Sequence, residues 1–163
     1  MDVLLEFLGK DDDALKILHS RIEFELNGSL MSNIHLAAMN GHADCVKVMI
    51  QNGVDVNAVS KMRLYGCRTW KEEHTKVTAL HIAAIHFQTD VLQVLLQNGA
   101  DVNFMDKFNN TALCSAASKG LIRSTLQLIC FGAEINKEAL RYDQTKLLQP
   151  INDSLESLRA GNG

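Results

Sequence analysis

Histidine and cysteine are the residues of this 163-residue chain best suited to nucleophilic, acid–base or metal chemistry, and it has six and four of them. A cysteine nucleophile needs a histidine within hydrogen-bond reach and a group that orients the histidine. Cys67 and His74 are near enough in sequence to meet, but nothing around them supplies an oxyanion hole. Two ligands also fall short of the four that structural zinc takes. Gly9, Gly28 and Gly66 are isolated and form no phosphate loop. We therefore expect a protein without catalytic residues, metal or cofactor.

The remaining cysteines look structural. Cys45, Cys114 and Cys130 stand among Val, Leu, Ile and Ala, and we predict them to be small core residues. No two cysteines form a CxxC pair, which favours a reducing compartment, either the cytoplasm or the nucleus.

Composition narrows the class of protein. Hydrophobic residues make up 47% of the chain, enough for a packed core. The net charge of −3 gives no general attraction to nucleic acid. No apolar run reaches the roughly 18–20 residues that span a bilayer, so no membrane role is expected. The opening MDVLLEFLGKDDD lacks the basic start and cleavage site of a secretion signal, and we interpret it as a first helix.

The strongest signal is an internal repeat. Similar segments begin at Ser32 (SNIHLAAMNGHADCVKVMIQNGVDVN), Thr78 (TALHIAAIHFQTDVLQVLLQNGADVN) and Thr111 (TALCSAASKGLIRSTLQLICFGAEIN). The second and third starts are 33 residues apart, whereas the first and second are 46 apart, so thirteen extra residues lie between the first two units. No such unit can bury its apolar face alone, and stacked neighbours share one core.

Each unit has the same physical plan. Its first hydroxyl residue can cap a helix that contains two adjacent alanines, which let helices approach closely. A second helix carries apolar residues at helical spacing and ends at a glycine suited to the left-handed region, namely Gly53, Gly99 and Gly132.

The motifs TALHIAA and LLQNGADVN, repeated with this period, resemble the ankyrin repeats over about residues 32–136. The resemblance implies an all-α ankyrin-repeat solenoid of stacked helix-turn-helix units with short hairpin turns and helical caps at both ends. It also implies that His35 and His81 tie a helix to the adjacent turn, and that the third unit, with Cys114 at this position, loses that tie.

We expect one ankyrin-repeat domain over 1–163. Its parts are an N-terminal capping repeat (1–31), a first repeat (32–57), an inserted finger (58–77), a second repeat (78–103), a third repeat (104–136) and a C-terminal helical cap (137–163).

Partner binding is the function that the resemblance implies, through first-helix ends and through the turns before repeats. In this sequence the helix ends supply Met39, Asn40, Ile85, His86, Ser118 and Lys119, and the turn before the third repeat supplies Met105, Lys107, Phe108 and Asn110. We predict a non-enzymatic scaffold that acts as a monomer and binds a protein partner.

The inserted finger is basic and aromatic. Residues 61–76 hold five Lys or Arg against two Glu, and the predicted contacts are Arg63, Tyr65, Arg68, Trp70 and Lys71. Trp, Tyr and Arg are enriched at binding hot spots, which favours recognition. Two alternatives stay open: the finger folds back onto the repeats as a plug, or it is a neutral insertion.

Other functions stay open from sequence alone. They are a substrate adaptor for a ubiquitin ligase, an effector delivered into host cytosol by an intracellular bacterium, and a finger that binds nucleic acid. Asn103, with Leu95 eight residues before it, is also a candidate substrate for an asparaginyl hydroxylase, and ordinary turn chemistry is its alternative role.

Overall fold

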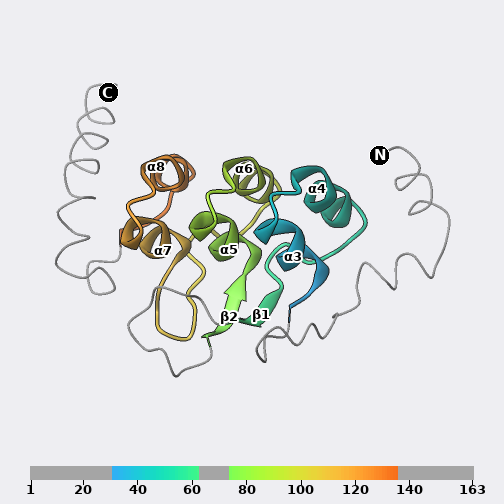
Figure 1. The fold of residues 1–163 in the computed structure, drawn as a ribbon, viewed down its shortest axis with the longest axis horizontal. Helices are drawn as coiled ribbons and strands as arrows, with labels where there is room; N and C mark the ends of the chain where they lie inside the picture. Colours follow the sequence, from blue (N-terminus) through green and yellow to red (C-terminus); the bar gives the residue numbers. More distant parts are fainter. Residues whose placement is uncertain (1–30, 63–73, 136–163) are drawn as a thin grey trace.

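The computed structural model describes residues 31–62 and 74–135, and these form three stacked helix pairs. Figure 1 shows the first helices of the pairs in one row and the second helices in another. The first-row helices are α3 (Asn33–Met39), α5 (Ala79–Ile85) and α7 (Ala112–Ser118); the second-row helices are α4 (Ala43–Gln51), α6 (Thr89–Gln97) and α8 (Ile122–Cys130). The predicted all-α repeat architecture is confirmed. Within the described ranges no helix is long and apolar enough to cross a membrane.

The helices begin and end where the repeat pattern predicts. Ser32, Thr78 and Thr111 are the N-caps of the first-row helices, and the Thr111 hydroxyl accepts the N–H of Cys114 at 3.3 Å. One residue after each second-row C-cap stands a glycine with φ of 85°, 85° or 89°. An L side chain is strained in that region, so glycine is the natural helix stop.

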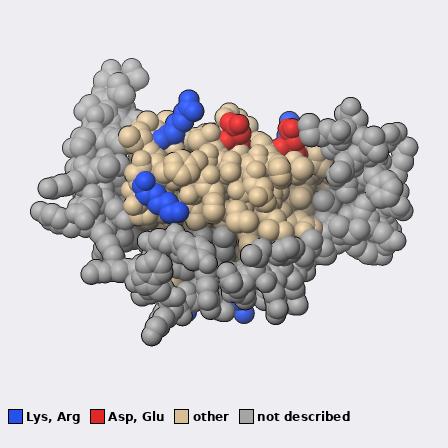
Figure 2. Space-filling model, viewed as in Figure 1, with Lys and Arg blue, Asp and Glu red and all other residues tan. Residues whose placement is uncertain are grey.

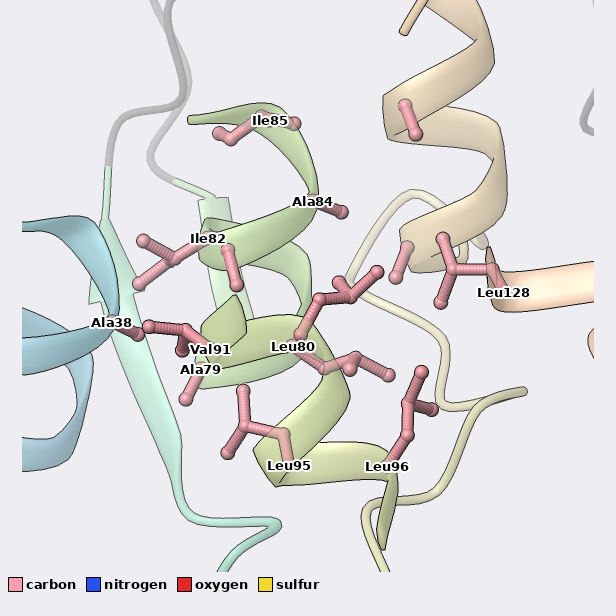
Figure 3. Close-up of a cluster of buried hydrophobic side chains, with 14 of the residues drawn as sticks. Ala38, Ala79, Leu80, Ile82, Ala84, Ile85, Val91, Leu95, Leu96 and Leu128 are labelled. Atoms are coloured by element: carbon pink, nitrogen blue, oxygen red, sulfur yellow. The ribbon is translucent and has the colours of Figure 1, made fainter. Parts of the chain in front are cut away.

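The core lies between the two rows of helices and is continuous from repeat to repeat. Figure 3 shows buried aliphatic side chains from α5 and α6 meeting Ala38 of the first repeat and Leu128 of the third. All seven residues of α5 are buried, because this helix packs against α3, α6 and α7. The paired alanines at 37–38, 83–84 and 116–117 are also buried, as expected for close helix contacts. Each fully buried Leu or Ile contributes about 1.5–3 kcal/mol to this shared core.

Two short strands, β1 (Val59–Met62) and β2 (His74–Thr78), pair antiparallel between the first and second repeats. Val59 pairs with Thr78 and Ser60 with Val77, and an irregularity follows, where Lys76 has φ of 65°. These strands form the base of the inserted finger.

The thirteen extra residues extend a turn that also exists, in short form, before the third repeat. There the Asp106 N–H donates to the Asn110 carbonyl at 2.9 Å, and Asn109 has φ of 59°. Sixteen residues separate Ser60 from Val77 and three separate Asp106 from Asn110, so the whole excess lies beyond a common base.

The predicted caps, residues 1–31 and 137–163, lie outside the described residues except for Met31, which is buried.

Candidate functional site

The base of the finger is anchored to the first repeat by His35. Its Nε2–H donates to the Val77 carbonyl at 3.1 Å, and its Nδ1 accepts the Ser32 hydroxyl at 2.6 Å. A carbonyl only accepts, so Nε2 carries the proton. His35 and Val77 are both fully buried. The finger therefore leaves the array from a fixed point.

The turn before the third repeat is anchored in the same way. His81 Nε2–H donates to the Asn110 carbonyl at 3.1 Å, while Nδ1 accepts the Thr78 hydroxyl at 2.8 Å. Burial lowers the pKa of His81, and the bond to Asn110 and the charge of Asp106 only partly oppose this effect. The ring is therefore neutral at pH 7, as these two bonds require.

Asp106 holds the tip of that turn together. Its carboxylate is buried and accepts the N–H groups of Phe108 and Asn110, both at 2.8 Å, and the Asn110 side-chain amide at 3.3 Å. Lys107 places its Nζ 5.6 Å from the centre of the Phe108 ring. The result is a stiff loop that offers an aromatic ring and a cation to solvent.

Predicted contact residues on the described repeats are mostly accessible. Asn40, Met105, Lys107, Ser118 and Lys119 are exposed, and Met39, His86, Phe108 and Asn110 are half-buried. Ile85 is different: only 5% of its surface is exposed, and it belongs to the core. Its position at the last turn of a fully buried helix leaves little of it for a partner.

A family model of three ankyrin repeats matches residues 34–139. The chain belongs to the ankyrin-repeat family. A search of curated proteins gave no match. Ankyrin repeats are generally protein–protein interaction modules, and the histidine ties described above are the ones that the family resemblance implied.

In the third ankyrin repeat Cys114 takes the histidine position. Among the described residues its hydrogen-bond partner is Thr111, whose hydroxyl lies 3.4 Å from its sulfur. The turn that a tie from this position would reach lies outside the described residues. Cys114 is buried, but Cys45 and Cys130 are exposed, and their predicted place in the core was wrong. Each cysteine directly follows or precedes a buried residue in its helix. Consecutive helical residues point about 100° apart, so a cysteine with apolar neighbours in sequence can still face solvent.

The central contacts of the predicted finger, Arg63, Tyr65, Arg68, Trp70 and Lys71, lie outside the described residues, as does Cys67. For His74 the structure gives the backbone, paired with Met62. No cluster of His, Cys, Asp or Glu suited to a metal ion occurs within 31–62 and 74–135.

Asn103 has the structural role of an ankyrin turn residue. Its Oδ1 accepts the Glu134 N–H at 2.8 Å, just as Asn57 Oδ1 accepts the Asp101 N–H at 2.8 Å. These bonds link each turn to the next. Its hydroxylation stays a prediction.

Sequence reasoning missed two features of the site. The first is Asp106, whose position in an Asp-x-x-x-Asn turn was the available signal. The second is a hollow on the opposite edge of the array, beside Phe87.

Proposed function

We propose that this ankyrin array is a non-enzymatic scaffold that binds a protein partner through its concave face and its inserted basic-aromatic finger. The concave face consists of the first-row helices and the turns before the repeats. The observation that carries the proposal is the anchored base of the finger: His35 and the β1–β2 pair hold both ends of the insertion. A fixed base reduces the entropy that placing the insertion against a partner would cost.

The accessible side chains near this base are consistent with a recognition surface. Met105, Lys107 and Phe108 lie on the neighbouring turn, which Asp106 stiffens. The finger adds Tyr, Trp and Arg, the residue types that dominate binding energy at protein interfaces. Flexible Met side chains suit an adaptable contact surface.

The chain itself supplies the control that tests the finger. Replacing Ser60–Val77 by the five-residue Asp106–Asn110 turn removes the thirteen extra residues and keeps the pairing at the base. Both proteins would be immobilised for a quantitative pull-down from eukaryotic cytosol, and circular dichroism would check folding. We expect specific partners to be captured by the whole chain and to fall at least about tenfold with the short turn, which corresponds to 1.4 kcal/mol.

The concave face is tested separately. Met105→Ala and Lys107→Ala should weaken capture of the same partners, because they change exposed atoms without disturbing the turn. If both the short-turn protein and these variants retained every partner, neither the finger nor the concave face would be the binding surface, and the proposal would be wrong.

A further inference from the structure

Phe87 has a backbone conformation for which the other two repeats use glycine at the equivalent position. Gly41 and Gly120 connect the two helices of the first and third repeats with φ of 78° and 67°, and Phe87 does so in the second with φ of 61°. A bulky L residue is strained there. Its ring gains no burial in return, since 70% of its surface is exposed.

A second departure lies beside it, in the first turn of α8. The equivalent residues in α4 and α6 are Asp44 and Asp90, which stabilise the positive end of a helix dipole. In α8 this residue is Arg123, which has the unfavourable sign. Next to it Ile122 is 58% exposed, where the other repeats have Ala43 and Thr89.

These departures surround one hollow, which we name the Phe87 groove. It measures about 370 Å³. Its described lining includes Phe87, Thr89, Leu121, Ile122, Arg123 and Ser124. The apolar wall continues along α8 to Leu126, one helical turn after Ile122 and 41% exposed. The groove opens where the two helices of each repeat connect, at the edge away from the finger and its neighbouring turn.

The charged side chains that the third repeat places beside the groove are positive. Burial lowers the pKa of His86, and the charge of Lys119, the C-cap of α7, lowers it further, so these two groups are near each other. Within 31–62 and 74–135, neither Lys119 nor Arg123 forms an ion pair, and both are exposed. Figure 2 shows this face with Lys and Arg over α7 and α8 and with acidic side chains over α4 and α6. The third repeat has therefore reversed the charge that the other two repeats carry here.

We infer that the Phe87 groove is a second binding site, for a short segment of a partner protein that carries an apolar side chain next to carboxylates. The exposed ring and Ile122 would cover the apolar side chain, and Arg123 and Lys119 would pair with the carboxylates. Strain and unfavourable charge that gather at one place, without any gain in folding, are typical of a functional surface. Two cations beside an apolar hollow suit an acidic peptide better than nucleic acid, which needs a basic track.

The experiment is selection of peptides from a random displayed library on the full-length chain. We expect the selected peptides to share a large apolar residue flanked by Asp or Glu. Their affinity, measured by fluorescence polarisation on synthetic copies, should fall at least about tenfold for Phe87→Gly and for Arg123→Asp. Changing the peptide carboxylates to amides should weaken binding to the parent chain. The same change should not weaken binding to the Arg123→Asp variant any further.

The variants are chosen so that misfolding cannot imitate the result. Gly and Asp are the residues that the chain itself uses at the equivalent positions, and both should raise the melting temperature while removing binding. The matched control is Asp44→Arg, which makes the opposite charge reversal at the equivalent position of the first repeat. It should leave binding unchanged. Met105→Ala on the concave face should also leave it unchanged, which separates this site from the proposed function.

Three results would overturn the inference. The selected peptides could lack acidic residues, no peptide could be selected, or Phe87→Gly could bind the peptides as tightly as the parent chain. A fourth would replace it: if the parent chain self-associated in ultracentrifugation and Phe87→Gly did not, a second copy would be the occupant instead of a partner peptide.

Discussion

His81→Ala should remove about 3 kcal/mol from the free energy of unfolding. The side chain is fully buried and makes three hydrogen bonds: it donates to the Asn110 carbonyl and accepts the Thr78 hydroxyl and, at 3.4 Å, the Thr78 N–H. Each such bond contributes about 0.5–1.5 kcal/mol net, and the space left by a buried ring adds a similar or larger amount. Total stabilities of single domains are about 5–15 kcal/mol, so the loss is easily measured.

Urea unfolding followed by circular dichroism at pH 7.5 is the assay. His42→Ala is the matched control, because His42 is exposed and its side chain makes no capping bond, so its change should stay within about 0.5 kcal/mol. His81→Cys should fall between the parent and His81→Ala, because the Thr111–Cys114 pair shows that a cysteine keeps the local contact. A loss below about 1 kcal/mol for His81→Ala would refute the tie as a stabilising element.

The same histidine makes stability depend on pH. Burial holds the pKa of His81 below its ordinary 6.5. Below that pH the histidine of the unfolded chain therefore binds a proton, while the folded chain keeps its His81 neutral. The contribution of His81 to the free energy of unfolding is therefore fully present above about pH 6.5. It declines as the pH falls, by at most about 1.4 kcal/mol per pH unit. The decline between pH 7.5 and 5.5 should be shallower for His81→Ala, and an equal decline would contradict the assignment.

Four further changes test other parts of the structure. Thr125→Val should stabilise by about 1 kcal/mol in urea unfolding, because the fully buried hydroxyl has no partner among the described residues. Asp106→Ala should cost about 2–3 kcal/mol and speed hydrogen exchange in the 106–110 turn, since two backbone N–H groups lose their acceptor; an unchanged exchange rate would exclude this role. Phe87→Gly should stabilise by about 0.5–1 kcal/mol, the relief of strain minus the entropy that glycine adds to the unfolded chain. Asn103 should gain one oxygen by mass spectrometry after incubation with an asparaginyl hydroxylase, and an unmodified peptide beside a hydroxylated positive control would reject it as a substrate.

The repeat fold could be predicted because its determinants are local and recur. Hydroxyl caps such as Thr78, paired alanines and the stopping glycine Gly99 each act within one turn of helix, and a fixed period displays them three times. The histidine ties followed from the family resemblance, since His35 reaches a residue 42 positions away and spacing alone does not reveal that contact.

The binding surfaces could be predicted only in part. Exposed turn residues such as Met105 follow from the architecture, but Cys45 and Cys130 were misplaced because exposure depends on angular position around a helix. Ile85 is nearly covered because its helix is buried on every side. The Phe87 groove combines residues from two repeats, so no single stretch of sequence displays it.

The bonds that join the repeats explain why such an array can hold its fold and vary its surface. His35 and His81 each donate to a backbone carbonyl of the next turn, and Asn57 and Asn103 each accept a backbone N–H. Gln88 and Gln127 also reach back to carbonyls of the preceding repeat. In every case the partner is a main-chain atom, so the residue that contributes it can change its side chain without losing the bond. A few side chains fix the stacking, and those around them, including the finger and the edge of the Phe87 groove, are left for recognition. The fold is therefore readable from a short list of residues, whereas the partner is encoded in the positions that the fold does not constrain.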